Sequence, residues 1–219
     1  DRANYLRAIW VEMSRIHSHL LWLGLLADAM GFESLFMESW RLREKILDMF
    51  DETAGGRIIH SVNQVGGVQK DMDSTMLNHL LEAIKDIESD IKPVVDTFLR
   101  DYSVQSRLKG AGVLKKEDAI ALGAVGPMLR ASGVEYDVRM LGYGAYKDLT
   151  VKPITSTDGD CYGRCEVRLM ELFQSFDLIR EAIGKIPAGD ISVPVKGNPS
   201  GEYFMRIEQP RGEAIYYVK

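Results

Sequence analysis

Seven apolar residues recur at alternating steps of three and four between positions 74 and 100, and this spacing constrains the fold more than any other feature. Such steps place the residues on one stripe of an α-helix, as in helical bundles. The spacing therefore predicts a helix over 74–100 that packs against other helices. Pro93 falls inside this helix and predicts a kink, because proline cannot donate to the carbonyl of Ser89. The stripe consists of Leu77, Leu80, Ile84, Ile87, Ile91, Val94 and Phe98.

Three further segments with helical spacing can cover this stripe. Residues 2–30 predict a long, mostly buried helix, and a second helix is predicted from about Phe36 to a glycine pair at 55–56. A fourth helix is predicted to begin after Asp158 or Asp160, either of which can act as its N-cap. The apolar stripe of this last helix consists of Cys165, Leu169, Leu172, Phe176, Ile179 and Ile183.

Two segments between these helices are less regular. Residues 57–71 contain two adjacent glycines and little helical periodicity, which predicts a loop that can hold a short strand. Loops of this length often carry function. In the region 101–157 we expect turns at its glycines and a short helix over 116–122, which has acidic residues near its N-terminus.

The C-terminal part of the chain predicts a β-hairpin. Side chains alternate in character over 203–208, and residues 213–218 are strand-like after a turn that contains proline and glycine. The sequence therefore predicts a mainly α fold, a bundle of long helices with a small C-terminal hairpin. We expect residues 1–219 to form a single domain, with its helical core over 1–187 and the hairpin over 201–219.

Composition excludes several classes of protein. The residues are 46% hydrophobic and 27% charged, which is ordinary for a soluble globular protein and argues against extended disorder. The net charge is -5, without a run of Lys and Arg, so we expect no binding of nucleic acid. The most apolar stretch, 20–27, is far shorter than the roughly 20 residues that cross a bilayer. We see no signal peptide and expect an intracellular protein.

Cysteines and histidines are the first candidates for chemistry. Cys161 and Cys165 lie one helical turn apart, but no further soft or imidazole ligand lies near them in the sequence. We favour a buried structural role and keep metal binding as the alternative. His17 and His19 point to different sides of a helix, so they cannot form one chelate. We expect structural histidines, with a ligand or proton-relay role as the alternative, and expect His79 at the surface.

Three acidic residues lie among apolar neighbours near the first two helices. Asp28, Glu38 and Glu44 would each have to pair or shift their pKa if buried there. Arg41 and Arg43 are the nearest partners, so we favour ion pairs in a bundle over proton transfer. The sequence has no motif of a nucleotide-binding loop or of a hydrolase, and we expect it not to bind a nucleotide itself.

The run GPMLRASGVEYDVR, from Gly126 to Arg139, is the clearest family signature, and five further blocks accompany it in order along the chain. Together the six blocks resemble the large subunit shared by respiratory complex I and the membrane-bound, energy-converting nickel-iron hydrogenases. Arg130 and Asp137 within the run fit a structural ion pair as well as a site. The other blocks are RANYLRAIWVEMSRIHSHLLWLG (2–24), LREKILDMFDETAGGR (42–57), NQVGGVQKD (63–71), GDCYGRCEVRLMELFQS (159–175) and EQPRGEAIYYV (208–218).

This resemblance implies a nickel-iron hydrogenase large-subunit-like fold and a central fragment of a larger subunit. In the hydrogenase members, two Cys-x-x-Cys pairs hold a nickel-iron centre, one before the position matching Asp1 and one beyond that matching Lys219. Cys161 and Cys165 match neither pair, so the fragment is expected to have no metal ligands and no cofactor of its own. It would be an inactive scaffold within an oxidoreductase.

The resemblance also assigns candidate site residues. Pro210 and Arg211 match a Pro-Arg segment whose guanidinium lies over the metal centre in hydrogenases, which implies the outer shell of a redox cavity. The alternative is a hairpin turn with a solvent-facing arginine. Asp28 lies one residue out of register with an acidic residue linked to the quinone cavity of complex I. Independently of the resemblance, His60 beside the Gly-Gly loop is a further candidate, because the intermediate pKa of histidine suits a ligand or proton relay.

Two activities follow for the parent protein. ESLFMESWRLRE and NQVGG resemble the hydrogenase branch, in which electrons from an iron-sulphur small subunit serve proton reduction or hydrogen oxidation. The alternative is the quinone-site subunit of an NADH:quinone oxidoreductase without nickel, where an arginine often stands at Gln64. Either branch implies an iron-sulphur small subunit and membrane subunits as partners, at the cytoplasmic, inner face of the cell membrane. A third interpretation is a module that only binds partner subunits.

Overall fold

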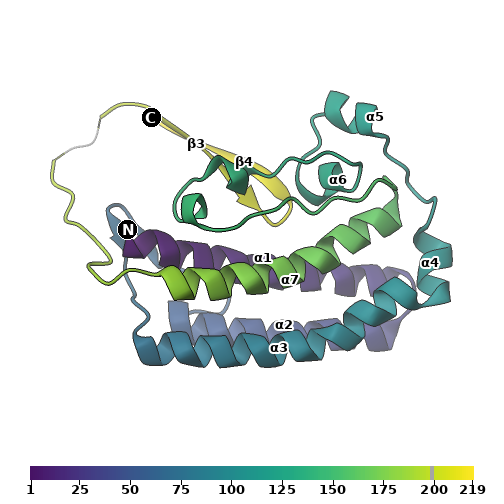
Figure 1. The fold of residues 1–219 in the computed structure, drawn as a ribbon, viewed down its shortest axis with the longest axis horizontal. Coiled ribbons are helices and arrows are strands. Elements are labelled where there is room, and N and C mark those ends of the chain that lie inside the picture. Colours follow the sequence, from purple (N-terminus) through teal and green to yellow (C-terminus); the bar gives the residue numbers. More distant parts are fainter. Residues whose placement is uncertain (198–199) are drawn as a thin grey trace.

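Four long helices form the body of the protein in the computed structural model, which describes residues 1–197 and 200–219. They are α1 (Arg2–Ala29), α2 (Glu33–Ala54), α3 (Ser74–Arg100) and α7 (Cys161–Lys185). Helix α1 contacts α2 and α7, and α3 contacts the same two helices, so the four enclose one apolar core (Figure 1). The fully buried side chains of this core include Leu20, Leu23, Leu80, Ile84, Leu172 and Phe176.

Helix α3 has the bounds that its apolar stripe predicts, and all seven residues of the stripe are buried. The carboxylate of Asp73 caps the helix, because it accepts a hydrogen bond from the backbone N–H of Met76 at 2.8 Å. Pro93 lies inside the helix, which continues past it. Figure 1 shows that α3 bends on its way to α4 (Tyr102–Leu108), in agreement with the predicted kink.

The other predicted elements are also present, with small changes in their bounds. Helix α2 begins three residues before Phe36 and ends at Gly55, which has a positive φ of 79°. The loop over 57–71 contains a two-residue hairpin, β1 (Asn63–Gln64) with β2 (Gly67–Val68). Within the described residues, each helix is too short or too polar to cross a membrane.

A second layer covers α1 and α7 on the side away from α2 and α3 (Figure 1). It consists of the irregular region after α4 and the C-terminal hairpin, in which β3 (Tyr203–Gln209) pairs with β4 (Gly212–Val218) in antiparallel register. The region contains α5 (Lys116–Ala121), α6 (Gly126–Arg130) and the 3-10 turns η1 (Val138–Leu141) and η2 (Tyr146–Asp148).

Asp160 is the N-cap of α7, one of the two residues predicted for this role. Its carboxylate accepts from the backbone N–H of Gly163 at 2.9 Å and from that of Gly110 at 2.7 Å. Replacing Asp160 with alanine should therefore cost about 1–2 kcal/mol of unfolding free energy, the upper range for a lost cap, because the buried N–H of Gly163 and the partly buried N–H of Gly110 both lose their acceptor. Urea unfolding checks this, and the exposed Asp158→Ala, which caps nothing, should change stability by less than about 0.5 kcal/mol.

Candidate functional site

The turn at Pro210 and Arg211, predicted as the outer shell of a redox cavity, is held in place by helix α1. The fully buried guanidinium of Arg15 donates to the backbone carbonyl of Glu208 at 3.0 Å and to that of Gln209 at 3.2 Å. These are the two residues before the turn. A side chain fixed by the bundle therefore positions the end of β3, and with it the start of the turn.

The run GPMLRASG supports the same turn from the other side. Gly126, its first residue, has a φ of +63°, and a Cβ built on it would lie 2.4 Å from the Cα of Gly212. A Cβ on Gly212 would in turn lie 2.7 Å from the backbone nitrogen of Gly126. The two backbones touch, so glycine is required at both positions. The family signature and the Pro-Arg turn thus form one packed unit.

A small cavity of about 40 Å³ lies beneath the turn, between α1 and α7. Two leucines of α1 form part of its wall. Because its lining comes from the turn as well as from two helices, the cavity joins the hairpin to the helical body. Its other lining residues are Ser18, His19 and Trp22 of α1, Arg168 of α7, and Pro210 and Arg211 of the turn.

The two arginines of this cavity differ in burial. Arg168 is only 6% exposed, and its guanidinium lies over the ring of Trp22, 4.1 Å from the ring centroid. It donates to the backbone carbonyl of Arg164 at 2.8 Å. Burial lowers the pKa of Arg168 to about 10. Arg211 is exposed, and within the described part of the chain neither Arg168 nor Arg211 forms an ion pair.

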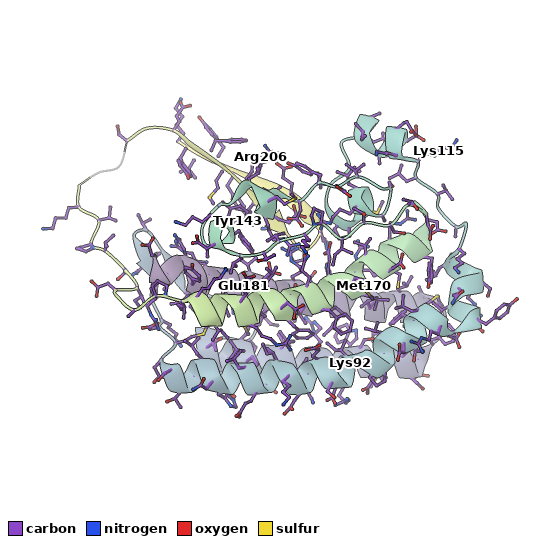
Figure 2. All side chains as sticks on the ribbon, in the orientation of Figure 1. Lys92, Lys115, Tyr143, Met170, Glu181 and Arg206 are labelled. Carbon is purple, nitrogen blue, oxygen red and sulfur yellow. The ribbon has the colours of Figure 1, made fainter. Side chains whose placement is uncertain are left out.

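A cluster of charged side chains lies directly beside the cavity, under the hairpin. Each member is at most 2% exposed. In Figure 2 the labelled Tyr143 lies in the layer above α7, and its hydroxyl accepts from the backbone N–H of Glu208 at 3.1 Å. The buried charge cluster, as we call this group, consists of Glu12, Arg15, His19, Arg130, Asp137, Arg139, Glu171 and Glu208.

Arg130 is the centre of this cluster. Its Nε donates to Glu171 at 2.9 Å, and one of its terminal nitrogens donates to Glu208 at 2.8 Å. The same nitrogen lies 3.4 Å from the carboxylate of Asp137. The ion pair that the sequence offered for Arg130 and Asp137 is therefore present. Arg130 therefore joins three elements, since its partners lie on α7, on β3 and in the segment before η1.

Glu12 is a second centre of the buried charge cluster. Its carboxylate accepts from Arg139 at 3.2 Å, from the hydroxyl of Tyr146 at 2.5 Å and from that of Ser175 at 2.7 Å. Burial alone would raise the pKa of Glu12, but the guanidiniums of Arg15 and Arg139 lower it to about 2. This carboxylate therefore stays ionised at neutral pH.

His19 lies at the border between the cluster and the cavity. Its Nε2 is 2.7 Å from the carboxylate of Glu171, and both side chains are buried. Burial lowers the pKa of His19 to about 4, and nearby Arg168 and Arg15 act in the same direction against the opposing effect of Glu171. The imidazole is therefore neutral at pH 7 and donates its proton to Glu171. The expected structural role of His19 agrees with this burial.

Two other predicted site residues lie elsewhere. Asp28 is exposed in the last turn of α1, so the expectation of a buried carboxylate that must pair was wrong for it. His60 stacks on Phe50, with ring centroids 4.1 Å apart. Neither residue lines the cavity beneath the turn. Their roles in a redox site stay predictions.

The ion-pair partners predicted in α2 were correct for Glu38 and wrong for Glu44. Arg41 binds Glu38 at 2.6 Å, as predicted. Glu44 pairs with Arg57 from the following loop instead. Arg43 places its guanidinium 5.0 Å from the centroid of the Trp40 ring, so its preferred contact is aromatic.

The remaining candidates have mainly structural surroundings. Cys165 is buried, as the structural interpretation expects, and burial raises the pKa of its thiol to about 12. Cys161 is half-buried, 3.1 Å from a terminal nitrogen of Arg164. His17 lies edge-on to Phe50, and His79 is at the surface, as expected. Among the described residues, no three His, Cys, Asp or Glu side chains are placed to hold a metal ion.

Sequence reasoning missed most of the buried charge cluster. Glu12 and Arg15 lie in a helix that is buried on nearly every side, and Glu171 lies directly before Leu172 of the apolar stripe of α7. Charged residues at such positions indicate buried ion pairs, because a helical bundle can bury a charged side chain only when it is paired. Glu208 gave no comparable signal, since the alternation in β3 grouped it with exposed residues.

Comparison with known proteins supports the predicted family. Residues 29–198 match the family described as respiratory-chain NADH dehydrogenase, 49 Kd subunit. The chain is 36% identical to the alpha subunit of the membrane-bound hydrogenase of Pyrococcus furiosus, with 100% of this chain and 55% of that protein covered. It is 41% identical to the C/D subunit of the NADH-quinone oxidoreductase of Bacteroides thetaiotaomicron, covering 97% and 41% respectively.

A third relative is named for another electron donor. The chain is 38% identical to the D subunit of the F(420)H(2) dehydrogenase of Methanosarcina mazei, covering 100% of this chain and 61% of that protein. The chain thus spans about half the length of the curated relatives it matches. These relatives are subunits of oxidoreductases, and with the match over 29–198 they place this chain in the family of the 49 Kd subunit of respiratory-chain NADH dehydrogenase.

Proposed function

We propose that this chain is the central scaffold of the large subunit of a membrane-associated oxidoreductase complex, and that it presents Arg211 to a redox cavity completed by other segments. The observation that carries the proposal is the position of the Pro210–Arg211 turn. It lies over a cavity between α1 and α7 and is fixed by Arg15 and by the contact of Gly126 with Gly212. A cation held in this way suits an anionic or polarised group.

We propose that residues 1–219 have no role in metal binding and that any ligands of a nickel-iron centre come from outside them. This agrees with the described residues, among which no three His, Cys, Asp or Glu side chains are placed to hold a metal ion. What this chain contributes is structural and electrostatic. The buried charge cluster fixes the hairpin on the bundle, and Arg211 provides an exposed positive charge beside the cavity.

Hydrogenase activity of the parent, fed by an iron-sulphur small subunit, is the first proposal, because ESLFMESWRLRE and NQVGG resemble that branch. The quinone-site function of an NADH:quinone oxidoreductase is the second, favoured by the higher identity to a relative of that name. In both cases we propose membrane subunits as further partners, and a cytoplasmic position at the membrane's inner face. Metal analysis of the full-length protein separates them. Stoichiometric nickel supports the hydrogenase, whereas quinone reductase activity without nickel refutes it.

Replacing Arg211 with glutamine should lower the turnover of the full-length complex about tenfold or more, because a charge-assisted hydrogen bond contributes roughly 1.5–3 kcal/mol. The assay is hydrogen-dependent dye reduction or quinone reduction, whichever activity the parent has. Arg100→Gln is the matched control, since Arg100 is 80% exposed at the end of α3, remote from the turn. Equal turnover of the Arg211 variant and the wild type would refute the proposed role of the turn.

A further inference from the structure

The cavity beneath the Pro210–Arg211 turn combines two positive charges with no negative one. Arg168 reaches it from α7 and Arg211 from the hairpin, and the lining residues in the described part of the chain include no carboxylate. Glu171, about one helical turn after Arg168 on α7, is already bonded to Arg130 and His19. Arg168 and Arg211 thus line one cavity, and among residues 1–197 and 200–219 neither arginine has a carboxylate in contact with it.

Burial makes this arrangement costly for Arg168 in particular. A guanidinium has five N–H donors, and the structure assigns Arg168 one hydrogen bond, to the carbonyl of Arg164. The face of the Trp22 ring stabilises part of the positive charge of Arg168 through a cation–π contact. Buried cations are otherwise paired with anions, because the desolvation of an unpaired charge is unfavourable. The neighbouring Arg164 differs, since its terminal nitrogens bond to two backbone carbonyls.

The cavity also has the chemistry and the size for a small anion. Ser18 and His19, both with polar side chains, also line it. A volume of about 40 Å³ admits a group of only a few atoms. The planar fork of a guanidinium matches the two oxygens of a carboxylate, which it can bind through two parallel hydrogen bonds.

We propose that Arg168 and Arg211 form a binding site for a carboxylate group, with Arg168 as the buried anchor and Arg211 as the exposed second contact. The group belongs either to a small free carboxylate or to an aspartate or glutamate side chain of another segment of the complex. This site shares Arg211 with the proposed redox cavity. The test of this site measures carboxylate binding by the chain itself and not turnover. The carboxylate site can therefore fail while the proposed function holds, and the proposed function can fail while the site holds.

The test is a calorimetric titration of the 219-residue chain with acetate and formate at constant ionic strength, with the neutral acetamide as the control ligand. We expect saturable binding of both carboxylates and none of acetamide. Arg211→Gln should bind acetate about tenfold more weakly, the effect of one lost charge-assisted hydrogen bond, whereas Arg100→Gln should bind like the wild type. Arg211 is exposed, so the Arg211→Gln variant is expected to fold. The test therefore does not depend on Arg168→Gln, a variant of the buried anchor that can fail to fold.

A second titration distinguishes the two sources of the carboxylate. If a side chain of the complex occupies the site, the full-length protein should bind acetate at least tenfold more weakly than the 219-residue chain. Equal affinities indicate a free carboxylate. Either result supports the site. Absence of saturable acetate binding by the 219-residue chain, or binding that Arg211→Gln leaves unchanged, overturns it.

Discussion

Replacement of Arg130 with methionine is expected to lower the free energy of unfolding by roughly 3–5 kcal/mol, the range for the loss of one partner of a buried ion pair. The side chain is fully buried and contacts the carboxylates of Glu171, Glu208 and Asp137. Methionine fills similar space but leaves three buried acids with less positive charge. The loss therefore comes mainly from carboxylates left without their partner.

Urea unfolding of the 219-residue chain measures this loss. The matched control is Arg41→Met, which breaks the exposed pair with Glu38 and should cost at most about 1 kcal/mol. The double variant Arg130→Met with Glu171→Gln should lose less than the two single variants together, because it removes both charges of one contact. A loss below about 1 kcal/mol for Arg130→Met would show that the cluster does not contribute to stability as the contacts indicate.

Acid should destabilise the protein between about pH 6.5 and pH 4 because His19 is held neutral in the folded state. Its folded pKa is lowered to about 4, below the value of 6.5 for a free histidine. As the pH falls below 6.5, the unfolded chain binds a proton that the folded chain does not, so stability decreases until the folded pKa is reached. The difference in pKa corresponds to about 3 kcal/mol at full effect.

The measurement is the free energy of unfolding at pH 7 and at pH 4 for the wild type and for His19→Gln, whose amide can still donate to Glu171. We expect the variant to lose less stability than the wild type over this interval. His79→Gln is the control, since His79 is exposed, and it should leave the pH dependence unchanged. The contribution of Glu12 belongs to a lower window, from about pH 4.5 to pH 2, because its pKa is depressed. An identical slope for His19→Gln and the wild type would contradict the assignment.

The helical bundle could be predicted from the sequence because its signals are local. Alternating steps of three and four indicate the face that a helix buries, and the predicted N-cap Asp160 lies directly beside the helix that it begins. The hairpin could be predicted for the same reason, since its turn residues separate two short strand-like segments. The family resemblance then identified the Pro-Arg turn as a candidate site.

Most of the charged interior could not be predicted, because most of its contacts join distant parts of the chain. Glu12 accepts a hydrogen bond from Ser175, 163 residues away, and the local sequence around either residue does not indicate this partner. Arg168 looked like an ordinary helix residue until the fold placed it against Trp22 and the turn. Asp28 gave the opposite error, since its apolar neighbours indicated burial and the helix exposes it in its last turn.

The bond from Arg15 to the carbonyl of Glu208 has a consequence for synthesis on the ribosome. The two residues are separated by 193 positions, so α1 emerges long before the strand that covers its guanidinium. Until then Arg15 must remain hydrated or bound by a chaperone, because two of its hydrogen-bond acceptors are backbone carbonyls of the strand β3. A nascent chain of this protein can therefore assemble its apolar bundle early, but it closes its charged interior only when nearly every residue has been made.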